Sequence, residues 1–223
     1  MDFEIIYQDN LLLVINKPSR ITVEEISLKL KDQFSSLSLL GEENRYGLIH
    51  RLDKDTSGVL LFSKDLSYLK EIKERFKKRE VQKKYLLLCW KRTKKEEGKI
   101  ITYMKRAGKD RRKHSSFSFI KGGRRAETDY KVLEKFKNYS LIEAYPLTGR
   151  KHQLRSQFAY LGHPITGDKL YRFSDQEDPP GLERHFLHAE SISLKTSKGK
   201  KEFHSPLPED LKKIISNLRC QKN

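Results

Sequence analysis

Cysteine is scarce in this sequence. The 223 residues include two, Cys89 and Cys220, and they match no CxxC spacing. This arrangement does not favour a disulfide framework or a cysteine-based zinc site. The seven histidines form no HExxH or other tight metal-ligand spacing, so a zinc site built on histidine is not indicated either. We therefore expect a reduced protein that holds no metal.

Long apolar runs are also missing. The longest, such as Leu11–Ile15 and Leu86–Trp90, are far shorter than the roughly 20 residues that a membrane-spanning helix needs. The N-terminal sequence MDFEIIYQDN starts acidic and contains no extended apolar core, so it does not match a signal peptide. The expectation is a soluble, cytoplasmic protein with no membrane partner.

Several catalytic signatures are absent as well. The sequence has no GxGxxG or GxxxxGK[ST] phosphate-binding loop and no GxSxG nucleophile elbow. Asp53 and Asp55 could supply the two carboxylates of a glycosidase, but a loop does not fix the separation that this chemistry needs. The function must therefore be sought in other features.

Positive charge is what the sequence has in excess, with 47 Lys and Arg against 30 Asp and Glu and a formal net charge of +17. Such a surplus implies a polyanionic partner, either nucleic acid or an anionic membrane surface. Residues 91–125 contain fourteen Lys or Arg and three acidic residues, so this segment carries +11 of the total. A mobile basic loop would have a similar composition, but this concentration of charge favours a binding surface.

Hydrophobic periodicity predicts many strands with a few helices between them. We expect helices over residues 23–34, from Asp65, over about 151–161, and from Pro208 onward. We expect strands around the Gln8–Asn10 turn and in VQKKYLLLCW, AETDYKVLEKF, YSLIEAYPL and HFLHAESISL, and Phe117, Phe119 and Ile120 suggest strand within the basic segment. This order, without repeats or linkers, predicts an α+β fold with a mixed, mostly antiparallel sheet.

One stretch, GLIHRLDKDTSGVLLFSKD, places a dense polar cluster between two apolar pieces. Gly47–Ile49 leads in and Val59–Phe62 leads out, and both are expected to be core strands. Between them lie two carboxylates, cations and two hydroxyls. A loop held by two core strands is where catalytic residues are often found.

This stretch also resembles a known family. HRLDKDTSG is similar to the HRLDxxTSG signature of the RluA-type RNA pseudouridine synthases. Other segments match in the same order: IIYQDNLLLVINKPS resembles the opening hairpin, KKYLLL the second motif, AETDY the A-x-T-x-Y strand, PLTGRKHQLR with LGHPITGD the third motif, and FLHA with PLP the closing segments. The resemblance covers nearly the whole chain and implies the pseudouridine synthase fold, with flanking helices and a catalytic cleft.

The resemblance implies isomerisation of uridine to pseudouridine within RNA, with no cofactor and no metal. The uracil is detached from the ribose, turned and rejoined through carbon, and a nucleophilic carboxylate can hold the sugar or the base meanwhile. By motif position that carboxylate is Asp53, and attack on the sugar and attack on the base both stay open. Arg155 of the third motif would pair with Asp53 and keep it ionised where water is excluded.

Other site residues also follow from the resemblance. Tyr85 maps to the tyrosine that lies against the target base, where stacking holds an extruded base, and its hydroxyl is a candidate acceptor of the C5 proton. Leu187 maps to the leucine beneath the base. Arg51 would support extrusion by filling the vacated space in the RNA stack. Arg150 and His152 are interpreted as RNA-phosphate or structural groups.

The chain also departs from the family pattern. Gly is common where this chain has Arg20 and Lys91, and His is usual at Gln157. These changes remove no proposed catalytic group but weaken the transfer of substrate specificity. The short N-terminus leaves no room for the S4-like RNA-binding domain of many relatives. We therefore predict a single catalytic domain over residues 1–223, with recognition assigned to the basic segment 91–125.

Two other functions are compatible with parts of this sequence. A non-catalytic RNA-binding protein could use the same scaffold, but the presence of Asp53, Tyr85 and Arg155 together favours catalysis. A DNA-binding protein would not explain carboxylates within a surface that should bind polyanions. The expected partner is RNA, either ribosomal or transfer RNA, and the expected oligomeric state is a monomer.

Overall fold

The structure, a computed structural model, describes residues 3–34, 37, 40, 45–108, 110–196 and 199–221. It contains ten strands and four helices in the order β1–β2–α1–β3–α3–β4–β5–β6–β7–β8–α4–β9–β10–α5 within that part of the chain. The α+β class and the mostly antiparallel pairing are confirmed. The chain divides into two compact units, residues Met1–Lys83 with Ala189–Pro206, and Lys84–His188 with Leu207–Asn223.

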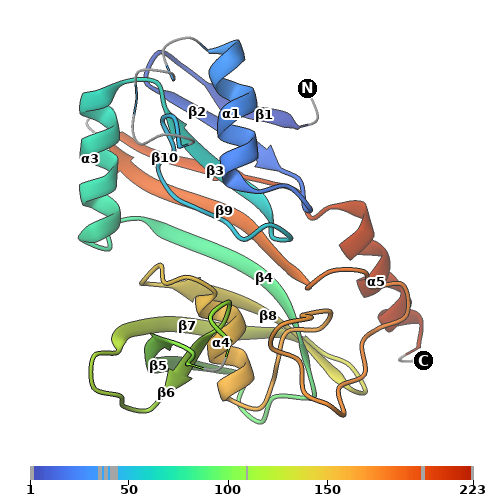
Figure 1. The fold of residues 1–223 in the computed structure, drawn as a ribbon. Coiled ribbons are helices and arrows are strands. Elements are labelled where there is room, and N and C mark those ends of the chain that lie inside the picture. The colour runs from blue at the N-terminus through green and yellow to red at the C-terminus, as the bar shows by residue number, and fades with distance from the viewer. Residues whose placement is uncertain are drawn as a thin grey trace. The chain divides into compact units, whose positions relative to one another are not determined.

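The first unit consists of strands with two helices (Figure 1). Its strands follow the order β1-β2-β3-β9, and β10 pairs with β9. The bounds are β1 Glu4–Gln8, β2 Leu12–Lys17, α1 Val23–Gln33, β3 Ser57–Ser63, α3 Leu66–Lys77, β9 Leu187–Thr196 and β10 Gly199–His204, with β9 entering this unit at Ala189. The expected hairpin about the Gln8–Asn10 turn and the helices near 23–34 and from Asp65 are confirmed.

Side chains at the helix N-termini explain where the first unit's helices begin. Thr22 accepts a hydrogen bond from the Glu25 N–H while the Glu25 carboxylate accepts one from the Thr22 N–H, which is a complete capping box at α1. Asp65 accepts from the Tyr68 N–H at 2.7 Å and so caps α3. These caps fix the two helices that flank the polar loop in the sequence.

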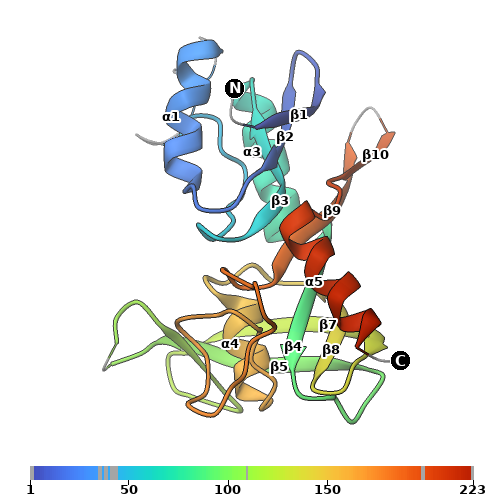
Figure 2. The same cartoon turned by 90° about the vertical axis from the view of Figure 1, so that its right-hand side faces the viewer.

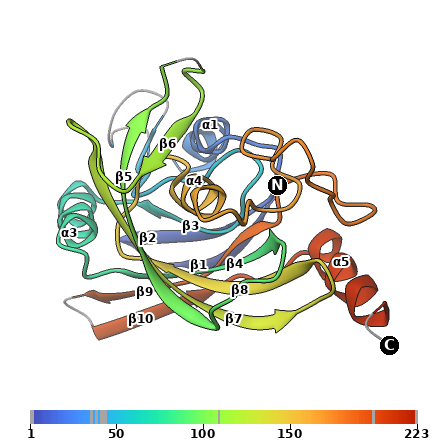
Figure 3. The ribbon, with the colours of Figure 1, turned by 90° about the horizontal axis from the view of Figure 1, so that it is seen from below.

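The second unit has a curved sheet in the order β4-β8-β7-β5-β6 (Figure 3). The bounds are β4 Gln82–Trp90, β5 Glu97–Arg106, β6 His114–Phe117, β7 Arg124–Lys135, β8 Tyr139–Pro146, α4 Gln153–Tyr160 and α5 Glu209–Cys220, with β4 entering this unit at Lys84. The predicted hairpin of β7 and β8, the helix near 151–161 and the helix after Pro208 are confirmed.

The two helices of the second unit cover opposite faces of its sheet (Figure 2). Alternation along β4 explains this, because successive strand residues point to opposite faces. Leu87 packs in a cluster with Phe158 of α4, whereas Leu88 packs in another with Leu211 and Ile215 of α5. The position of α4 against one face matters for the site, since this helix carries Arg155.

Two strand expectations were wrong in detail. Gly47–Ile49 makes a turn and one isolated bridge, between Leu48 and Phe62, and does not form a strand. The reason is that Gly47 adopts φ +66, which interrupts extended backbone. In the basic segment, β6 ends at Phe117, and Phe119 lies in the irregular connection that follows.

Candidate active site

The segment that precedes Asp53 runs along one edge of β3. The Ser63 N–H donates to Gly47 O at 2.7 Å and the Ile49 N–H donates to Leu61 O at 3.1 Å. A Cβ at Gly47 would lie 2.3 Å from Ser63 O, so only glycine allows this approach. The polar loop therefore starts from a fixed point beside a fully buried strand.

Asp53 is half-buried and lies in a turn closed by the Thr56 N–H, which donates to Asp53 O at 3.1 Å. A buried ammonium lies under this turn. The Lys17 side chain is fully buried, and its Nζ donates to Lys54 O at 2.9 Å and to Thr56 O at 2.9 Å. Nζ also donates to Pro18 O at 2.7 Å. Of these three charge-assisted bonds, the two to Lys54 O and Thr56 O join the end of β2 to the loop that carries the predicted nucleophile.

Lys17 was missed by sequence reasoning. It ends the apolar run of β2, and the only signal is its place in the NKPS segment of the quoted hairpin motif. A lysine is almost never fully buried unless its charge is satisfied, so this burial marks a position with a demanding structural role.

Gly58 fixes the other end of the loop. It has φ +122, and a Cβ there would lie 2.1 Å from Ala189 O. Any other residue would push β3 away from the β9 backbone. The glycine of the TSG part of the motif therefore has a structural explanation in this unit, and the loop is held at both ends.

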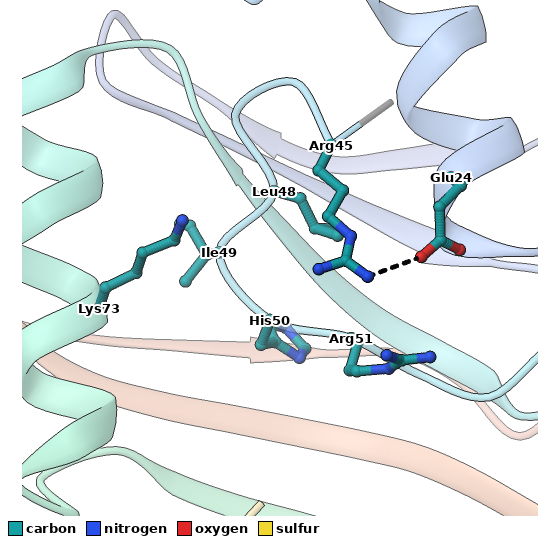
Figure 4. A pocket seen from close by; sticks show the side chains of 7 residues that line it. All are labelled: Glu24, Arg45, Leu48, Ile49, His50, Arg51 and Lys73. Carbon is teal, nitrogen blue, oxygen red and sulfur yellow. Dashed lines mark hydrogen bonds and ion pairs between the residues drawn. The ribbon is translucent and has the colours of Figure 1, made fainter. Parts of the chain in front are cut away.

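His50 and Arg51 lie side by side before Asp53 (Figure 4). The Leu61 N–H donates to His50 Nε2 at 3.2 Å, and the imidazole stacks on Phe76 with centroids 5.3 Å apart. Burial, followed by the charge of Lys83, lowers the pKa of His50 to about 3. The ring is therefore neutral at pH 7, with its proton on Nδ1, and acts as an anchor for the loop.

Arg51 is exposed and lines a hollow of about 210 Å³ in the first unit. Arg45 and Lys73 also line it, and Arg45 Nη2 lies 3.4 Å from Glu24 (Figure 4). The predicted role of Arg51 in base extrusion stays a prediction. Its exposure and its position two residues before Asp53 are compatible with that role.

Arg155 occupies the third position of α4 and is 8% exposed. Its Nε lies 2.6 Å from Asp168 Oδ2 and its Nη2 lies 2.9 Å from Asp168 Oδ1, which is a bidentate ion pair. Burial by itself would raise the pKa of Asp168, but the bonds and charge of Arg155 outweigh it, so the pKa lies below its usual value. Arg155 is therefore a buried cation whose orientation is fixed by Asp168. Its predicted pairing with Asp53, which belongs to the other unit, stays a prediction.

Asp168 was not selected from the sequence. It ends the LGHPITGD segment of the third motif, where a turn-forming aspartate is common. The Leu170 N–H and the Tyr171 N–H also donate to its Oδ1, at 2.9 and 3.1 Å. Asp168 thus shapes its own turn and orients Arg155 with the same carboxylate.

His152 also takes part in a structural network. It is the N-cap of α4, has φ 57 and makes no side-chain cap. Its Nδ1 lies 3.1 Å from the Tyr171 hydroxyl, and that hydroxyl accepts from the His114 N–H at 2.8 Å. The Arg155 guanidinium lies 5.3 Å from the Tyr171 ring centre. These contacts support the interpretation of His152 as a structural group.

Tyr85 and Leu187 meet in one cluster of the second unit. Leu187 is 4% exposed and belongs to the core that contains Leu154 and Phe158 of α4, and the partly buried Tyr85 packs against that core. Tyr85 pairs with Ala144 in the sheet. The two residues assigned to the target base are thus supported by the same core as the helix that carries Arg155.

Gln157 explains one departure from the family pattern. It is fully buried and accepts from Thr128 Oγ1 at 2.6 Å. Its Nε2 donates to Thr102 Oγ1 at 3.1 Å and to Ala126 O at 3.2 Å. This side chain ties α4 to β5 and β7, so its role in this chain is structural.

Arg150 lies three residues before α4 begins, and its Nε donates to Arg125 O at 3.1 Å. It lines a hollow of about 380 Å³ with several other cations of the second unit. A phosphate-binding role therefore has a suitable setting.

Among the described residues, no group of three or more His, Cys, Asp or Glu side chains could hold a metal ion, and no helix has the length and apolar character needed to cross a bilayer.

Comparison with known proteins connects these features. Residues 11–160 match the family model described as RNA pseudouridylate synthase. Ribosomal large subunit pseudouridine synthase C of Vibrio vulnificus is 36% identical over 98% of this chain and 70% of that protein. The protein of the same name from Haemophilus influenzae is 35% identical over 100% of this chain and 70% of its own length.

The solved structure of human RNA pseudouridylate synthase domain containing 4 has the same fold. It superposes with a TM-score of 0.78 at 25% identity and covers 96% of this chain and 92% of its own. The matched region includes both the Asp53 loop and Arg155. The chain belongs to the RNA pseudouridylate synthase family of RNA-modifying isomerases.

Proposed function

We propose that this protein isomerises specific uridines in a structured RNA and that Asp53 is the nucleophile. The observation that carries the assignment is the construction of the loop. Two bonds from the buried Lys17 ammonium to Lys54 O and Thr56 O, a turn closed onto Asp53 O and the glycine at position 58 all constrain the backbone of the loop that carries the half-buried Asp53. A reactive group must be held this way, because small misplacements cost much of its rate.

The RNA is proposed to be ribosomal, because curated relatives carry that substrate in their names. Transfer RNA is the alternative. In the reaction the bond between C1′ and N1 breaks and a bond between C1′ and C5 forms. C5 loses its proton and N1 gains one, so the overall change is an isomerisation with no redox partner.

Arg155 is proposed to keep Asp53 ionised during catalysis. A buried guanidinium favours the charged form of a nearby carboxylate, and Asp168 supports the proposal because its two bonds fix the orientation of Arg155. Tyr85 and Leu187 would hold the base from the core that also supports α4. Arg51 would assist extrusion, while Arg150 and His152 would act in phosphate binding and local structure.

The test compares pseudouridine in the RNA of cells with and without the gene, mapped by carbodiimide-dependent reverse-transcription stops. Wild-type protein should restore a site that deletion removes. Asp53→Asn should not restore it, because the amide is a poor nucleophile of nearly the same shape. Asp55→Asn is the matched control from the same loop and should restore the site.

Release of tritium from C5-labelled uridine in transcribed RNA gives the same comparison with purified protein. Full activity of Asp53→Asn would remove the nucleophile assignment. An unchanged pseudouridine map after deletion, combined with RNA binding, would favour a non-catalytic RNA-binding protein on this scaffold.

A further inference from the structure

The turn between β6 and β7 presents an aromatic ring to solvent. Phe119 is 73% exposed, more than any other large apolar side chain among the described residues. The Gly123 N–H donates to Ile120 O at 3.0 Å and closes the turn. Tyr103 of β5 supports the ring edge to face, with centroids 5.5 Å apart at 67°. A single exposed apolar residue needs no function by itself, so the surroundings of Phe119 decide its meaning.

Those surroundings are strongly cationic. The hollow of about 380 Å³ in the second unit, here called the cationic hollow, has no carboxylate in its lining. Its basic lining residues are Lys105, Arg106, His114, Arg124, Arg150 and Lys151. Five permanent positive charges in one concave site attract an anion with several charges, and nucleic-acid phosphate is the anion that matches a strongly basic surface.

The aromatic turn and the cationic hollow are connected. Gly122, three residues after Phe119 in the connection between β6 and β7, lines the hollow. Lys105 lines it too, and its Nζ donates to Lys121 O at 3.5 Å. Three residues of chain keep the Cα atoms of Phe119 and Gly122 within about 11 Å of each other. An oligonucleotide strand can therefore engage both features at once.

We propose that Phe119 and the cationic hollow form a binding site for an unpaired stretch of RNA outside the catalytic loop. A base stacks on Phe119, and neighbouring phosphates enter the hollow. Unpaired RNA is favoured because its bases can leave the strand and stack on aromatic side chains, whereas duplex RNA exposes mainly backbone. The proposal rests on the proposed function, and it adds a selectivity for RNA that contains a single-stranded segment besides the modified uridine.

The test measures dissociation constants of the full-length protein for a single-stranded RNA oligonucleotide of mixed sequence and for the perfectly paired duplex of that sequence. Phe119→Ala should weaken single-strand binding roughly tenfold, the range typical of one stacked base, and should leave duplex binding unchanged. Phe119→Tyr should bind as wild type, because the ring is kept. Leu133→Ala, which removes another exposed apolar side chain of this unit, should have no effect.

Salt dependence separates the two parts of the site. Arg124→Gln should reduce the steepness of log K against log salt by about 0.7, the value for one phosphate contact with a single strand. Phe119→Ala should leave that slope unchanged. Lys213→Gln, which removes an exposed charge of α5, should change neither the slope nor the affinity.

Equal single-strand affinity of Phe119→Ala and wild type would overturn the proposal, and so would an equal loss on duplex RNA. These binding measurements need no turnover. Failure of Asp53 as nucleophile would appear as retained activity in Asp53→Asn with intact effects of Phe119. Failure of the aromatic site would appear as unchanged binding in Phe119→Ala while Asp53→Asn is inactive.

Discussion

Replacing Lys17 by Met tests how the Asp53 loop is held. Methionine fills a similar volume but removes the ammonium that donates to three backbone oxygens. Each bond from a charged donor contributes about 1.5–3 kcal/mol, so the three together contribute at least about 4.5 kcal/mol. Removal of the buried charge also relieves a desolvation cost of several kcal/mol. We expect the free energy of unfolding to fall by about 2 kcal/mol.

The effect on catalysis should exceed the effect on stability. Lys54 O and Thr56 O would lose their anchor, and the loop that carries Asp53 would relax. A displacement of about 1 Å at a reacting group costs on the order of 100-fold in rate. Because the Lys17 side chain is fully buried and does not reach solvent, kcat should fall about that much while KM for RNA stays nearly unchanged.

Denaturant unfolding and tritium release measure the two effects on the same samples. Lys200→Met serves as the control, since it removes an exposed lysine of β10 in the same unit. A Lys17→Met protein that is less stable but keeps its kcat would refute the reasoning about the loop, because the ammonium would then support the fold without positioning Asp53.

Two further predictions concern stability alone. The pKa of His50 is lowered to about 3, so its contribution to stability is complete above the unfolded value of about 6.5 and is lost as pH falls toward the folded value. Between pH 7 and pH 5, wild type should lose about 2 kcal/mol more unfolding free energy than His50→Gln, and parallel pH profiles would contradict this. Arg79 follows the C-cap of α3 with φ 64, so Arg79→Gly should stabilise by about 1 kcal/mol in thermal unfolding. Arg79→Ala, which keeps the strained φ, should not stabilise, and an equal gain from both variants would remove backbone strain as the cause.

Most of the fold could be predicted because its elements have strong local signals. The helix from Asp65 was marked by apolar residues at helical spacing, and the helix after Pro208 by its amphipathic pattern. The prediction of a strand at Gly47–Ile49 was wrong, because three apolar residues give the same sequence pattern in a strand and in a turn that packs beside a strand. Only the contact with Ser63, distant in sequence, distinguishes the two.

The candidate site was less predictable than the fold. Asp53 and Arg155 were found through motif resemblance, whereas Lys17 and Asp168 act through contacts with residues that the sequence does not place beside them. A lysine at the end of a strand is ordinarily a solvated residue, and nothing local shows that this one is fully buried. Supporting groups of this kind become visible only when the backbone that they bind has been positioned.

Arg20 and Lys91 stand at the two positions where the resemblance implies glycine, and both carry positive charge. Arg20 has φ 69 and Lys91 has φ 68, so both residues have the left-handed backbone that glycine favours. At Lys91 the surrounding contacts enforce it: the Lys91 N–H donates to Asn138 O at 2.7 Å, and the Ser140 hydroxyl donates to Lys91 O. A non-glycine residue in this conformation costs about 1–2 kcal/mol. Both positions therefore accept strain, and each adds a positive charge of the kind that attracts a polyanionic substrate.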